Sequence, residues 1–188
     1  MSGTAILLVL VLIFILLVVF AVRSAVKAEQ AFTSSLATCV DFSPTFSYVS
    51  MFGPLSIALD IERQKVAVVP KGGIPWILAR AEILAVEVLR DGKSVQKTNR
   101  GSQLTAAAVG AVLLGPLDLL LGGLTGSKRT EEKIRNLSLR IFTNHVAVPV
   151  LEIIFYQSPG SDLEDSTVKN QGAILTEWDG RLRALLAG

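Results

Sequence analysis

Cysteine and histidine are almost absent from this chain of 188 residues, which has one of each. The single cysteine, Cys39, excludes an intramolecular disulfide and a cysteine-based metal cluster, and we interpret it as a small half-buried hydrophobic residue. A zinc site needs several histidine or cysteine ligands, so Cys39 and His145 are too few to build one. The lack of a disulfide framework agrees with a reducing compartment.

Charged residues are also scarce, because they make up 18% of the chain and leave a formal net charge of +2. Lysine and arginine are scattered among acidic residues and form no basic stripe, which argues against nucleic acid as a partner. Hydrophobic residues account for 51% of the sequence, and the mean hydropathy is +0.53. This balance is typical of a membrane-associated chain with one ordinary domain.

Catalytic sequence patterns are missing as well. No G-x-S-x-G elbow surrounds a serine. Gly110 and Gly115 have the glycine spacing of a P-loop, but Pro116-Leu117 stands where Lys-Ser or Lys-Thr is required. We therefore predict no enzyme, no catalytic residue, no metal site and no cofactor.

One long apolar run is present instead, residues 5 to 22 (AILLVLVLIFILLVVFAV), without proline, glycine or charge. A helix of about 18 to 20 residues spans the hydrocarbon core of a bilayer. A cleaved secretory signal is the alternative, but no basic residue precedes the run and no A-x-A pattern follows it. We predict a transmembrane anchor over residues 1–22 and a helical stalk over residues 23–49.

The flanks of the run set its orientation. Arg23 and Lys27 follow it, whereas only the α-amino group precedes it. The positive-inside rule then places the N-terminus outside and the main domain in the cytoplasm. The predicted location is the cytoplasmic (inner) membrane.

Strand patterns begin after the stalk. In SIALDIERQKVAVV, residues 56–69, apolar Ile57, Leu59 and Ile61 alternate with other residues before a polar corner and a second apolar run, which predicts a hairpin. ILAVEVLRDGKSVQKT, residues 83–98, predicts a second hairpin that turns at Asp91-Gly92. RNLSLRIF and VPVLEIIFY predict two further strands.

The end of the chain has a helical period. Apolar residues of the segment 171–187 fall on one helix face, with Trp178 as the expected anchor against a sheet. A helix lying on a membrane surface is the alternative, although such a helix carries more lysine and arginine. The preceding SPGSDLEDSTVKNQG is predicted to be a loop.

In this order, the two hairpins, the GAVLLGPLDLLLGGLTGSK insert, the RNLSLRIFTNHVAVPVLEIIFY pair and the AILTEWDGRLRALL helix resemble the bacterial pleckstrin-homology-like (PH/GRAM-like) domains of membrane-associated proteins. The resemblance covers about residues 50–187. It implies a half-open antiparallel barrel capped by the C-terminal helix, acting as a binding or scaffolding module. With the anchor, the predicted fold class is α+β: a transmembrane helix and a PH-like domain with a hydrophobic helical-hairpin insert at residues 104–126.

The insert has three interpretations. A second transmembrane helix from Leu104 to Leu124 would place Asp118 in the bilayer at a cost of about 2.5 to 3.5 kcal/mol, and it would split the sheet across the membrane. A hairpin turning at Gly115-Pro116-Leu117-Asp118 would return to the side it left, with basic residues at both ends. A soluble insert packed against protein is the third. We favour the hairpin.

Small residues in the insert predict close helix packing. Gly122 and Gly126 form a G-x-x-x-G pair, and Gly110 and Gly115 widen the small face. We therefore expect self-association into a homo-oligomer through this segment.

Basic residues near the first hairpin are candidate contacts for anionic lipid headgroups. They are Arg63, Lys65 and Lys71; solvated loop charges are the alternative. The predicted function is a non-enzymatic, membrane-anchored cytoplasmic module that binds a partner protein or a lipid surface. The alternative is a membrane-perturbing, holin-like or toxin-like pore former that acts through residues 104–124.

Overall fold

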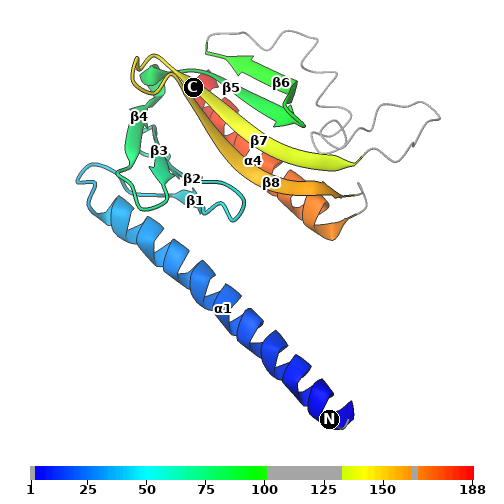
Figure 1. Ribbon diagram of the computed structural model, residues 1–188. Coiled ribbons are helices and arrows are strands. Elements are labelled where there is room, and N and C mark those ends of the chain that lie inside the picture. Colours follow the sequence, from blue (N-terminus) through cyan, green and yellow to red (C-terminus); the bar gives the residue numbers. More distant parts are fainter. Residues whose placement is uncertain (1–2, 101–132, 162–164) are drawn as a thin grey trace, which may run out of the picture.

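The computed structural model describes residues 3–100, 133–161 and 165–188, and Figure 1 shows the arrangement of their elements. A long N-terminal helix leads into two four-stranded antiparallel sheets and a C-terminal helix, which confirms the predicted α+β class. The elements are α1 (Gly3–Ala37), β1 (Phe46–Tyr48), β2 (Leu55–Asp60), β3 (Lys65–Pro70), β4 (Trp76–Ala79), the 3-10 turn η1 (Arg80–Glu82), β5 (Ile83–Arg90), β6 (Lys93–Asn99), β7 (Ile134–Thr143), β8 (Val150–Ser161) and α4 (Ser166–Ala187).

α1 is one uninterrupted helix of 35 residues, about 52 Å long at 1.5 Å per residue. The predicted anchor and residues 23–37 of the predicted stalk are therefore parts of the same helix, whereas residues 38–49 are not helical and contain β1. Its side chains from Leu7 to Val22 are exposed. Among the described residues, α1 is the one helix long and apolar enough to cross a membrane.

Sheet A has the strand order β1-β2-β3-β4. The predicted first hairpin is confirmed as β2 and β3, with Ile57 opposite Val68. Ile61, expected to continue the strand, lies in the turn and is exposed. β1 was not predicted, because three residues are too few to show an alternating pattern. The strand lies before residue 50, which was the expected start of the domain.

Sheet B has the strand order β6-β5-β7-β8. The predicted turn at Asp91-Gly92 is confirmed, with φ angles of 51° and 75° at its two residues, as a tight hairpin of this type requires. β7 and β8 are the two further predicted strands. Because β5 is antiparallel to both of its neighbours, β6 and β7 run in the same direction on either side of it.

A row of alternating charges crosses all four strands of sheet B. Lys97 lies opposite Glu87, Glu87 opposite Arg140, and Arg140 opposite Glu152. The guanidinium of Arg140 is 3.4 Å from the Glu87 carboxylate and 3.0 Å from that of Glu152. Shifting any strand by one residue would break this row, so the row favours the observed register.

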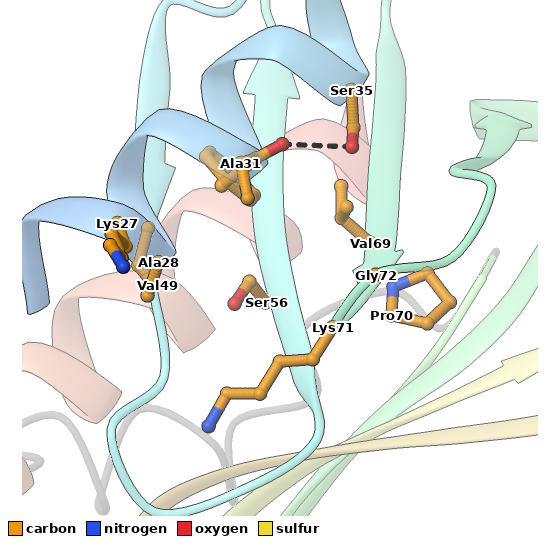
Figure 2. A pocket seen from close by; sticks show the side chains of 11 residues that line it. Lys27, Ala28, Ala31, Ser35, Val49, Ser56, Val69, Pro70, Lys71 and Gly72 are labelled. Carbon is orange, nitrogen blue, oxygen red and sulfur yellow. Dashed lines mark hydrogen bonds between the residues drawn. The ribbon is translucent and has the colours of Figure 1, made fainter. Parts of the chain in front are cut away.

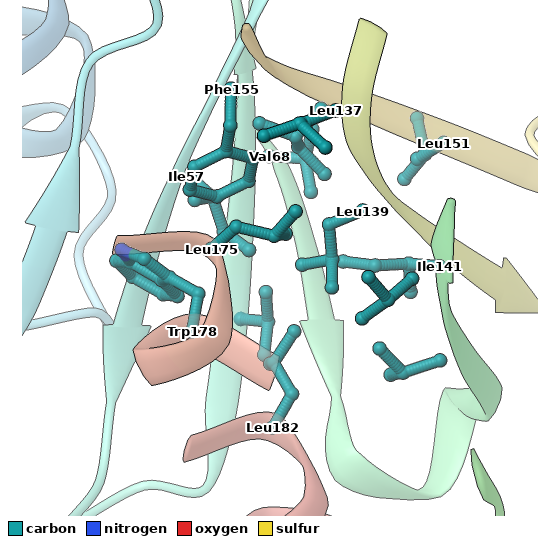
Figure 3. Close-up of a cluster of buried hydrophobic side chains, with 14 of the residues drawn as sticks. Ile57, Val68, Leu137, Leu139, Ile141, Leu151, Phe155, Leu175, Trp178 and Leu182 are labelled. Carbon is teal, nitrogen blue, oxygen red and sulfur yellow. The ribbon is translucent and has the colours of Figure 1, made fainter. Parts of the chain in front are cut away.

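The main core lies between the two sheets and α4. Figure 3 shows Trp178 of α4 among side chains from both sheets, with Leu175 and Leu182 on the same helix face. Trp178 has a relative exposure of 1%. The predicted role of this residue as the anchor of a capping helix is thus confirmed.

α4 begins at Ser166, not at residue 171 as predicted, and the segment before it is not wholly a loop. The Asp165 carboxylate accepts hydrogen bonds from the N–H groups of Thr167 and Val168, and such a cap starts a helix. β8 continues to Ser161, which pairs with Ile134. The polar residues that suggested a loop are the cap and the exposed first turn of the helix.

The edge of sheet A at β1 is held close to β8 and α4. The Tyr48 ring stacks on Phe155 at 4.3 Å, and its hydroxyl donates to Gln171 of α4. Burial raises the pKa of Tyr48 to about 12, so the hydroxyl stays a donor at neutral pH. The Ser50 hydroxyl donates to the carbonyl of Ile154 at 2.5 Å. These contacts bring one edge of sheet A to β8, as in the half-open barrel that was predicted.

Candidate functional site

The last turns of α1 pack on the outer face of sheet A. Phe32 and Leu36, with exposures of 6% and 3%, lie in a cluster separate from the main core. Their partners on the sheet include Ala58 and Ala67, which face each other across β2 and β3. Two alanines leave a flat surface on which a helix can come close. We call this contact the seam; it joins the exposed apolar helix directly to the domain.

The end of α1 and the residues that follow it cross sheet A antiparallel to β3. Lys27 to Ser35 border the same pocket as Val69 to Gly72 at the end of β3. Beyond the helix, Asp41 forms ion pairs with Lys65 and Arg63 at the start of β3. The turn after β3 therefore lies nearest to the exposed apolar part of α1, and the β2–β3 turn lies at the far end.

A pocket of about 250 Å³ lies between α1 and sheet A. Its walls are mostly apolar, from Ala28, Ala31 and Val69 among others, and Figure 2 shows Lys27 and Lys71 on its border and the Ser56 side chain between helix and sheet. Neither lysine forms an ion pair with any residue that the structure describes. The Ser56 hydroxyl oxygen accepts from the N–H of Ser50, which leaves its own proton to be donated.

The structure does not bring the three predicted headgroup contacts together. Lys65 pairs with Asp41, and the Arg63 guanidinium lies 3.2 Å from Asp41 and 3.2 Å from Asp60. The hydrogen bond and charge of Lys65, with those of Arg63, hold the pKa of the Asp41 carboxyl below its usual value. Lys71 lies at the other end of β3, beside the pocket. Their role as lipid contacts stays a prediction.

Asp60 is a buried carboxylate with an exposure of 1%. It accepts from the N–H of Ser43 at 2.7 Å, from the N–H of Arg63 at 3.0 Å and from the Arg63 guanidinium at 3.2 Å. Burial acts to raise its pKa, but these donors together hold the pKa below its usual value. Asp60 therefore fixes the chain after α1 to the β2–β3 turn.

Replacing Asp60 by alanine should lower the free energy of unfolding at pH 7 by about 2 to 3 kcal/mol, because charge-assisted hydrogen bonds are lost. Since the pKa of Asp60 is lowered in the folded state, its contribution is present above the pKa of the unfolded chain, about 3.9. It is lost as pH falls through the folded pKa. Denaturant unfolding of the parent and the Asp60→Ala chain at pH 7 and at pH 3 measures the loss in free energy of unfolding at each pH.

The matched control is Asp41→Ala, which removes the exposed carboxylate that shares Arg63 and should change stability far less, because exposed ion pairs contribute little. An Asp60→Ala effect as small as this, or one that persists unchanged at pH 3, would contradict the assignment.

A second, open depression of about 440 Å³ lies near the β2–β3 turn and is bordered by three arginines. Arg63 is paired with carboxylates, Arg80 donates to the carbonyl of Leu186 at 3.3 Å, and Arg100 donates to the carbonyl of Ala81. Each of the three guanidinium groups therefore already contacts an oxygen atom of the protein. Sequence reasoning missed this group, because its members are far apart in the chain and meet only through the turns.

The remaining candidate chemistry is sparse in the described part of the chain. His145 lies in the turn between β7 and β8, with its Nε2 atom 2.8 Å from a Glu82 oxygen. Among the residues that the structure describes, no group of three or more His, Cys, Asp or Glu side chains could hold a metal ion. Cys39 is half-buried beside the seam, where sequence analysis expected a half-buried small residue.

The insert lies outside the described residues, and so do its candidate residues Gly110, Gly115, Pro116, Asp118, Gly122 and Gly126. Its attachment points are described. Asn99 at the end of β6 lies opposite Ala85, whereas Leu137 in β7 lies opposite Arg90. The chain therefore leaves sheet B at one end of β5 and re-enters the same sheet at the other end.

Comparison with known proteins adds one match. The model of a family described as a glycine zipper containing PH domain matches residues 45–157. This range begins just before β1, ends within β8 and contains the whole insert, but it omits α1 and α4. No curated protein and no solved structure matches the chain.

Proposed function

Because the chain belongs to the family of glycine-zipper-containing PH domains, we propose that it is a membrane-anchored binding and scaffolding module without catalytic activity. A domain of this type suggests binding to a protein or a lipid surface. α1 anchors the module, and the seam holds the domain in a fixed relation to the anchor. No cofactor or metal is part of this proposal.

The observation that carries the proposal is the two-part surface of α1. From Leu7 to Val22 its apolar side chains are exposed, which is costly in water and favourable in a bilayer. At Phe32 and Leu36, one turn apart, the same helix is buried against sheet A. One rigid helix therefore joins a membrane-compatible segment to a folded domain.

We assign the N-terminus to the outside and the domain to the cytoplasmic side of the inner membrane of a bacterium. Arg23 and Lys27 directly follow the apolar run, and positive charge favours the cytoplasmic side. The side chains of Arg23 and Lys27 are exposed on α1, so they can contact anionic headgroups.

The insert fits this arrangement as a hairpin. Its two ends enter one sheet, and a segment that crossed the membrane once would separate them. We propose that the glycines at 110, 115, 122 and 126 make a self-association surface within the membrane boundary, where small residues let helices approach. The holin-like alternative depends entirely on residues 104–124, outside the described residues.

Replacing Leu12 and Leu16 together by arginine should remove the full-length chain from the membrane. Each arginine near the centre of a spanning helix costs about 2.5 to 3.5 kcal/mol, and both positions are exposed in the isolated chain. The measurement is the fraction that resists extraction by alkaline carbonate. We expect the parent chain and a Leu12→Ile, Leu16→Ile control to stay in the pellet.

Extraction of the parent chain would refute the anchor. Orientation is tested separately with single cysteines at Ser2 and Lys93 in a Cys39→Ala background. A membrane-impermeant maleimide should label position 2, but not position 93, in intact cells with a permeabilised outer envelope. Labelling at position 93 would reverse the proposed topology.

A further inference from the structure

We propose that the pocket between α1 and sheet A binds the interfacial part of an anionic phospholipid, with the lipid phosphate held between Lys27 and Lys71. The lipid comes from the membrane in which α1 is anchored, so this inference rests on the proposed function. It assigns a ligand to the seam, on the outer face of sheet A, and not to the loops of the first hairpin.

The position of the pocket along α1 suits such a ligand. Val22 ends the apolar run, and Lys27 lies about 7 Å further along the helix axis. The headgroup layer on each side of a bilayer is about 5 to 7 Å thick. The mouth of the pocket is therefore at the level of lipid phosphates, and Ser35, also on its border, lies further from the membrane.

The pocket chemistry matches the phosphate and the polar headgroup of an anionic phospholipid. Two lysines without an ion pair among the described residues offer charge. Apolar walls from Ala31 and Val69, further from the membrane than Lys27, suit the carbon atoms of a headgroup glycerol. The Ser56 hydroxyl, 3% exposed, already accepts from Ser50 and retains a proton for a headgroup hydroxyl.

The size of the pocket limits what can enter. About 250 Å³ equals the share of liquid volume of roughly eight water molecules at about 30 Å³ each. A folded peptide segment does not fit in that space, whereas a phosphate with a glycerol headgroup does. The other basic residues of this face are already used, because Lys65 and Arg63 are paired with Asp41 and Asp60.

The test uses the full-length protein in nanodiscs of phosphatidylcholine containing one tenth phosphatidylglycerol. Native mass spectrometry counts the phospholipids that stay bound after the disc is removed. We expect one retained phosphatidylglycerol on the parent chain and no retained phosphatidylcholine. Lys27→Gln with Lys71→Gln should reduce the retained lipid about tenfold or more, since each lysine near anionic lipid contributes roughly fivefold.

Ala31→Leu fills the pocket without changing charge and should reduce retention to a similar degree, since leucine is a good helix former. Lys93→Gln, which removes an exposed lysine from the start of β6, is the matched control and should retain the lipid. Equal retention of both lipids by the parent chain, or unchanged retention in Ala31→Leu, would overturn the pocket assignment. Failure of the anchor is recognised separately, because the parent chain would then not enter nanodiscs or resist carbonate.

Discussion

Replacing Trp178 by alanine is expected to lower the free energy of unfolding of the domain by about 3 to 5 kcal/mol, the usual cost of deleting a buried tryptophan or phenylalanine side chain. Trp178 is 1% exposed and lies where α4 meets both sheets. Its removal leaves a cavity that sheet A and sheet B cannot both close, because each is fixed by its own hydrogen-bonded ladder. A loss of this size is a large fraction of the total free energy of unfolding of a small domain.

The measurement is thermal unfolding of the full-length chain in a mild detergent, followed by circular dichroism. We expect the melting temperature to fall by about 10 to 20 °C. Trp76→Ala is the matched control, since Trp76 is half-buried in β4 and should cost less. Equal shifts for Trp76→Ala and Trp178→Ala would show that α4 is not the main cover of the core.

Much of the fold follows from local patterns. The alternation around Ile57 and Leu59 and the Asp91-Gly92 pair each depend on neighbouring residues, and β2–β3 and β5–β6 form as those patterns indicate. The helical period near Trp178 is likewise local, and α4 buries that face. Such signals need no knowledge of distant parts of the chain.

The order of strands in sheet B and the seam could not be predicted, because both depend on distant contacts. The sequence does not reveal that β7 pairs with β5 across the insert. Ala58 and Ala67 carry no signal of a partner in the sequence, yet α1 packs on them. Phe32 and Leu36 were assigned to a stalk, since four-residue spacing fits any helix and names no partner.

The candidate site depends on the same distant contacts. Arg63 and Lys65 were predicted to contact lipid headgroups, with solvated loop charges as the alternative. In the structure they meet Asp41, and Arg63 also meets Asp60. Lys71 was predicted together with them, but the structure places it at the other end of β3, beside α1. The neighbouring residues in the sequence therefore did not predict which lysine and arginine side chains are paired with carboxylates in the folded domain.

Replacing Phe32 and Leu36 together by alanine is expected to release the domain from α1 without unfolding it. Each buried side chain contributes about 2 to 5 kcal/mol, and both belong to the seam and not to the main core. The measurement is the distance distribution between spin labels at Ser24 and Lys93, in a Cys39→Ala chain reconstituted in a bilayer. We expect a narrow distribution to become broad, while the melting temperature of the main core stays nearly constant.

Val22→Ala with Val26→Ala is the matched control, because both valines are exposed on the same helix and should leave the distribution narrow. A narrow distribution in the Phe32→Ala, Leu36→Ala chain would show that the seam does not fix the domain to its anchor. Phe32 also borders the pocket, so a released domain should lose the retained phosphatidylglycerol as well. Loss of both properties together would mean that one contact sets the position of the domain and creates its lipid site.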